Sequence, residues 1–102
     1  MVGSNPAIHR RLLEKFLANA QQRMGELLQA SEARNTATVG QIAHTLKSAA
    51  RSVGAMRLGD LCQQLEHAGK AGDGECCQAL SKRLHATFDE VARILRSRLE
   101  EQ

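Results

Sequence analysis

Apolar residues recur at spacings of three and four along nearly the whole chain, which is the periodicity of one helix face. This pattern predicts four amphipathic helices joined by short turns, over about 6–34, 36–53, 56–70 and 74–100. Amphipathic helices with short connections bury their apolar faces by packing side by side. We therefore predict one all-α domain over residues 1–102, an antiparallel four-helix bundle with up-down-up-down topology, preceded by a tail over 1–5.

The predicted second helix has two distinct faces. Its buried face is expected to hold Val39, Ile42, Ala43, Leu46, Ala49, Ala50 and Val53. On the opposite side the same spacing brings together His44, Lys47, Ser48 and Arg51. Gly54 follows as a helix-ending residue. The pattern thus predicts an imidazole facing water in mid-helix, with a cation one turn away and a small serine beside it. Such an imidazole is a nucleophile on a rigid support.

The amino-acid composition limits which folds and which cellular locations are expected. One proline and two aromatic residues favour an all-helical chain with an aliphatic core. The sequence contains no apolar run of the roughly 20 residues that a membrane span needs, and no signal-peptide pattern. The three cysteines suggest no disulfide framework, and Cys62 falls in an apolar stripe as a small buried residue. These features predict a cytoplasmic domain without membrane contact.

Charge and motifs argue against several function classes. The net charge of +3 is spread along the chain, and there is no Trp or Tyr for base stacking, so we expect no nucleic-acid partner. No glycine-rich loop is built to hold ATP phosphates, and no paired ligand spacing such as H-E-x-x-H predicts a metal site. A basic surface around His44 would suit an acidic partner instead.

The stretch around His44 reads A-H-T-L-K-S-A-A, followed by Gly54-Ala55. It resembles the signature of histidine-containing phosphotransfer (HPt) domains, modules also found at the C-terminus of hybrid sensor kinases. The likeness continues through the stretches Arg57-Leu58-Gly59-Asp60-Leu61-Cys62 and Leu65-Glu66, and reaches back to Leu12-Leu13 and Phe16-Leu17. The main departure is Ser48, where the family usually has glycine.

This resemblance implies a phosphorelay intermediate in two-component signal transduction. His44 would accept a phosphoryl group from a phospho-aspartate on a receiver domain and pass it to another receiver domain. The receiver, of a hybrid kinase or a response regulator, would supply Mg²⁺, so no cofactor is expected on this chain. We expect a monomeric phosphocarrier without ATP-dependent kinase activity.

The resemblance also implies roles for neighbouring residues. Lys47 would offset phosphate charge, while Thr45, Ser48 and Arg51 would contact the partner. The family often places a glutamine where its side chain meets the phosphorylated histidine, and the matching position here is Glu66. Gln63, one turn earlier, is the next candidate for orienting the imidazole, and a solvated Glu66 is the plainer alternative. A rival function is a helical protein-interaction domain that uses no phosphohistidine chemistry.

Overall fold

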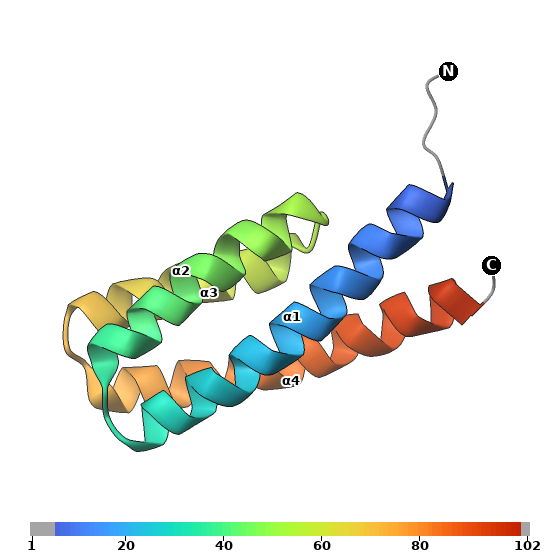
Figure 1. Cartoon of the computed structure of the whole chain (residues 1–102). Coiled ribbons are helices and arrows are strands. Elements are labelled where there is room, and N and C mark those ends of the chain that lie inside the picture. The colour runs from blue at the N-terminus through green and yellow to red at the C-terminus, as the bar shows by residue number, and fades with distance from the viewer. Residues whose placement is uncertain (1–5, 101–102) are drawn as a thin grey trace.

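The computed structural model describes residues 6–100, which form four helices and no strand; the predicted tail over 1–5 lies outside this range. The helices are α1 (Pro6–Glu32), α2 (Thr36–Ser52), α3 (Met56–Lys70) and α4 (Gly74–Glu100). They pack around one core as an antiparallel bundle in which each helix lies beside the next and α4 closes against α1 (Figure 1). The predicted all-α, up-down-up-down fold is confirmed.

Each turn has a local cause. Helix α1 ends at Glu32, before the predicted boundary at 34, because Arg34 adopts a φ of 56° and cannot continue the helix. The Asn35 side chain then caps α2 by accepting from the backbone N–H of Thr38 at 3.2 Å. Gly54 takes a φ of 80°, which is favourable for glycine, and so separates α2 from α3. These caps fix the ends of the helix that carries His44.

The two outer helices are much longer than the two central ones. Helices α1 and α4 have 27 residues each, whereas α2 has 17 and α3 has 15. The start of α1 and the end of α4 therefore extend past the turn between α2 and α3 (Figure 1). Of the two adjacent leucines near the start of α1, Leu12 is 45% exposed while Leu13 is buried. Helix α1 therefore enters the core through Leu13, Phe16 and Leu17.

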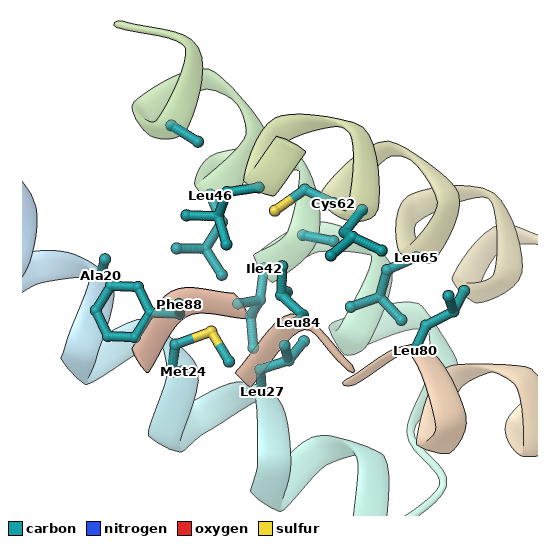
Figure 2. Close-up of a cluster of buried hydrophobic side chains, with 14 of the residues drawn as sticks. Ala20, Met24, Leu27, Ile42, Leu46, Cys62, Leu65, Leu80, Leu84 and Phe88 are labelled. Atoms are coloured by element: carbon teal, nitrogen blue, oxygen red, sulfur yellow. The ribbon is translucent and has the colours of Figure 1, made fainter. Parts of the chain in front are cut away.

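The core is aliphatic and sulfur-containing, with one aromatic pair. Phe16 of α1 and Phe88 of α4 meet edge to face, with ring centroids 6.5 Å apart. Figure 2 shows side chains from all four helices pointing into this interior, Leu27, Leu46, Leu65 and Leu84 among them. Cys62 is fully buried there, and burial raises the pKa of its thiol to about 12. It packs as the small apolar residue that its stripe predicts.

Candidate functional site

The side chain of His44 lies on the outer face of the α2–α3 pair, 62% exposed to solvent. It stands in the middle of α2, whose buried residues, Ala43 and Leu46 among them, hold the helix against the core. Since α2 contacts α1 and α3 on its flanks and only marginally α4 across the bundle, its outer face stays open. The imidazole of His44 is therefore exposed, as the sequence predicts.

Glu66 of α3 faces His44 across the helix pair. Its Oε2 lies 3.0 Å from Nδ1 of His44, and its side chain is only 12% exposed. The hydrogen bond from Lys47 is the main reason that the pKa of this carboxyl falls from 4.5 to about 2, and the hydrogen bond from His44 lowers it further. Glu66 is therefore ionised at neutral pH.

An ionised carboxylate can only accept hydrogen bonds. Nδ1 of His44 must then carry the proton of this contact, and in the neutral ring the other nitrogen, Nε2, keeps its lone pair. The geometry thus selects one tautomer and one orientation of an exposed imidazole. This is the arrangement of a nucleophile whose reacting atom is Nε2.

Lys47 is held by the same carboxylate. Its Nζ donates to Oε1 of Glu66 at 2.6 Å, and its side chain is only 18% exposed. The lysine expected to offset phosphate charge is thus engaged, in this structure, in fixing Glu66. Gln63, the other candidate for orienting the imidazole, instead accepts a hydrogen bond from Arg51 at 2.7 Å.

A second lysine, Lys70, belongs to the site although the sequence did not single it out. Its Nζ lies 3.6 Å from Oε2 of Glu66, the oxygen that also accepts from His44, and its side chain is 75% exposed. The signal that could have found it is its spacing of one helical turn from Glu66 on α3. Lys70 is the freer of the two cations around this carboxylate.

A groove of about 610 Å³ opens beside His44 between α2 and α3. Gly40 and Gly69 lie in its wall, where the two helices approach so closely that a Cβ on Gly69 would lie 2.7 Å from backbone atoms of Gly40. Thr45 also lines the groove, exposed, and its Oγ1 donates to the carbonyl oxygen of Gln41 at 3.3 Å. Ser48 is exposed one turn beyond His44. The imidazole is therefore accessible from the groove and from the Ser48 side.

Within residues 6–100, no three side chains among His, Cys, Asp and Glu gather closely enough to bind a metal ion. No helix in that range has both the length and the apolar character required to cross a bilayer.

Comparison with known proteins decides the family. The family model described as "Hpt domain" matches residues 11–94 of this chain, and that range includes α2, α3 and the whole His44–Glu66 pair. This chain belongs to the Hpt domain family. Hpt domains are phosphocarriers in histidine phosphotransfer, act in phosphorelay signalling, and exchange their phosphoryl group with receiver domains.

The fold comparison agrees with this family. The crystal structure of histidine-containing phosphotransfer protein B (HptB) from Pseudomonas aeruginosa PAO1 matches with a TM-score of 0.87 and 22% sequence identity. The match covers 91% of this chain and 81% of that chain, so the two Hpt folds agree over all but a small part of their lengths. Comparison with curated protein sequences gave no significant match.

Proposed function

We propose that His44 is the residue of this Hpt domain that carries the phosphoryl group. One observation supports it above the others: His44 is an exposed imidazole whose Nδ1 is held at 3.0 Å by Glu66, a carboxylate ionised at neutral pH. His67 and His85 are also present on the helices, but neither is paired with a carboxylate across two helices; His85 contacts Asp89 one turn away on its own helix, at 3.6 Å.

The proposed step is an in-line displacement at phosphorus. The lone pair of His44 Nε2 attacks the phosphoryl group of the receiver's phospho-aspartate, the bond between phosphorus and the aspartate oxygen breaks, and the aspartate leaves as a carboxylate. The proton on Nδ1 stays where it is, so the phosphorylated ring is cationic, and the negative charge of Glu66 stabilises it. Attack by a second receiver's aspartate on the same phosphorus reverses the step.

This domain and the receiver would together neutralise the negative charge of the transferred phosphoryl group. Lys47 and Lys70 lie at 2.6 and 3.6 Å from the Glu66 carboxylate, and Lys70 is exposed enough to turn toward a phosphoryl group on His44. The receiver would supply the Mg²⁺ and the acidic pocket, so that this chain contributes the nucleophile and its orientation. No ATP-dependent activity of the chain itself enters the proposal.

We further propose that the domain acts as a monomer in the cytoplasm. A single chain already contains His44, Glu66 and both lysines on one open face, so a second copy adds nothing to the site. All three cysteines, Cys62, Cys76 and Cys77, are free thiols, which fits a reducing compartment. Light scattering after gel filtration measures the molar mass in solution, and we expect the mass of one chain.

The function is tested by incubating the chain with a receiver domain phosphorylated on its aspartate. Acid-labile, base-stable phosphate should appear on the wild type and on His67→Gln, and should be absent from His44→Gln. Circular dichroism checks that each variant remains helical. If His44→Gln is phosphorylated as fully as the wild type, the proposal is wrong. If no chain is phosphorylated by any receiver tested, the alternative of an interaction domain without phosphohistidine chemistry gains support.

A further inference from the structure

Arg51 is held in a defined position on the same face as His44. Its guanidinium donates from Nη2 to the amide oxygen of Gln63 at 2.7 Å. Its alkyl chain lies directly over Gly59, where a Cβ would come within 3.1 Å of Cγ and 3.4 Å of Nε of Arg51. Gly59 thus leaves the space in which the arginine chain crosses from α2 to α3. A long exposed side chain fixed at both its stem and its head loses less rotamer entropy on binding a partner.

The charge of Arg51 is not cancelled by this contact. Gln63 is a neutral acceptor, and among the described residues no carboxylate lies within ion-pair distance of Arg51. Lys47 differs from Arg51, because its side chain is only 18% exposed and its Nζ donates to the ionised Glu66 at 2.6 Å. The two cations of α2 therefore have different partners: Lys47 is paired with a carboxylate of the domain, whereas Arg51 is oriented by a neutral amide.

Arg51 lies near enough to His44 for one docked protein to contact both residues. The two residues are separated by about two turns of α2, or roughly 10 Å along the helix, and exposed Ser48 lies between them. A protein that reaches Nε2 of His44 over Ser48 therefore covers the Arg51 guanidinium as well. Guanidinium groups recognise carboxylates through paired hydrogen bonds, which gives both energy and geometric selection.

From these observations we infer that Arg51 is a specificity-determining residue that binds a carboxylate on the surface of the receiver domain. The inference rests on the proposed function, since it requires the receiver to approach the His44 face. It adds that Gln63 and Gly59 act by orienting Arg51. A receiver without an Asp or Glu opposite Arg51 would be a poor partner for this domain.

The first test measures phosphoryl transfer from a phosphorylated receiver that the experiment under Proposed function has first shown to phosphorylate His44. Arg51→Met keeps the packing over Gly59 and removes the charge, so KM for the receiver should rise about tenfold while kcat stays within about twofold. The KM of the wild type should also increase with salt more steeply than that of Arg51→Met. Lys82→Met removes an equal charge from α4 and should change neither value.

A second variant separates recognition from stability. Gln63→Glu keeps the size of the acceptor but pairs Arg51 with a carboxylate inside the domain. If Arg51 serves the receiver, KM should rise as in Arg51→Met, while the melting temperature stays the same or increases. An unchanged KM in both variants, with His44 still phosphorylated, overturns the inference and leaves the proposed function intact. If the wild type itself is not phosphorylated on His44, the result counts instead against the proposed function.

Discussion

At the scale of single residues, the distinctive feature is a carboxylate in contact with the exposed imidazole. The family resemblance predicts that Glu66 takes the place where Hpt domains often have a glutamine, and an amide can either donate or accept. The ionised Glu66 only accepts, so it selects the Nδ1–H tautomer of His44. A largely buried negative charge needs compensation, and Lys47 provides it at 2.6 Å. The three side chains therefore work as one unit.

Replacing Glu66 tests this unit directly. Glu66→Ala leaves the ring of His44 without its acceptor, so phosphoryl transfer at saturating receiver should slow by about 10- to 100-fold. Glu66→Gln should recover most of the rate, because an amide oxygen can still accept from Nδ1. Gln64→Ala, an exposed change on the same helix, is the control and should have no effect. Equal rates for Glu66→Ala and the wild type would assign Glu66 to a purely structural role.

Because the pKa of Glu66 is low in the folded chain, the stability of the fold should depend on pH. A carboxyl whose pKa is 4.5 in the unfolded chain and about 2 in the folded one stabilises the fold fully above pH 4.5, and this contribution is lost as pH falls toward 2. The free energy of unfolding of the wild type should exceed that of Glu66→Gln near pH 7. The difference should shrink steadily between about pH 5 and pH 2 in urea titrations. A difference that is constant over this range would contradict the account.

At the scale of elements, the site depends on how closely α2 and α3 pack. Near the groove the helix backbones nearly touch, because a Cβ on Gly69 would lie 2.7 Å from Gly40 and from the carbonyl oxygen of Thr36. Glu66 lies about one turn from Gly69 on α3, so this contact sets the distance between Glu66 and His44. The turn at Gly54, with its φ of 80°, joins the two helices at their other ends.

The two glycines should respond differently to the same substitution. Gly69→Ala places a methyl group against rigid backbone, so we expect it to destabilise the fold by about 1–3 kcal/mol and to slow transfer by displacing Glu66. Gly40→Ala meets its neighbours at 3.6 Å, an ordinary contact, and should change stability by less than about 1 kcal/mol. Chemical denaturation of both variants measures this, and equal effects would mean that the close approach at Gly69 is unimportant.

Access over α2 gives a further prediction. Ser48 is exposed one turn beyond His44, where the Hpt family usually has glycine, so a bulky residue there should obstruct a docking receiver. Ser48→Phe should lower the transfer rate at least about tenfold with its helical spectrum intact. Ala18→Phe, on the exposed side of α1, is the matched control and should transfer normally. Normal transfer by Ser48→Phe would show that the receiver does not approach over this side.

At the scale of the whole molecule, the long helices α1 and α4 form the support and the short pair α2–α3 carries the proposed site. The Phe16–Phe88 contact fastens α1 to α4, and the aliphatic core, with Leu27 and Leu84 on the long pair and Leu46 and Leu65 on the short pair, joins the two halves (Figure 2). The buried residues of α2 and α3 belong to this common core, which holds the face with His44 against the rest of the bundle.

Periodicity was sufficient to predict the four helices and the bundle, because each helix must bury one apolar stripe. His44 and its exposure followed from its place opposite that stripe, and the family pattern pointed to Glu66. The hydrogen bond between Arg51 and Gln63 and the approach of Lys70 to Glu66 were not predicted. They depend on the rotation of α3 against α2 and on the rotamers of long side chains, which the spacing of residues along one helix does not determine.

The central claim is that Nε2 of His44 accepts the phosphoryl group while Glu66 holds Nδ1. The most direct test is a proton–nitrogen correlation spectrum of the chain labelled with ¹⁵N-histidine, recorded before and after phosphorylation by a phospho-receiver. We predict that phosphate appears on Nε2 of His44 and that Nδ1 remains protonated. Phosphate on Nδ1 of His44, or on His9, His67 or His85 instead, would contradict the account.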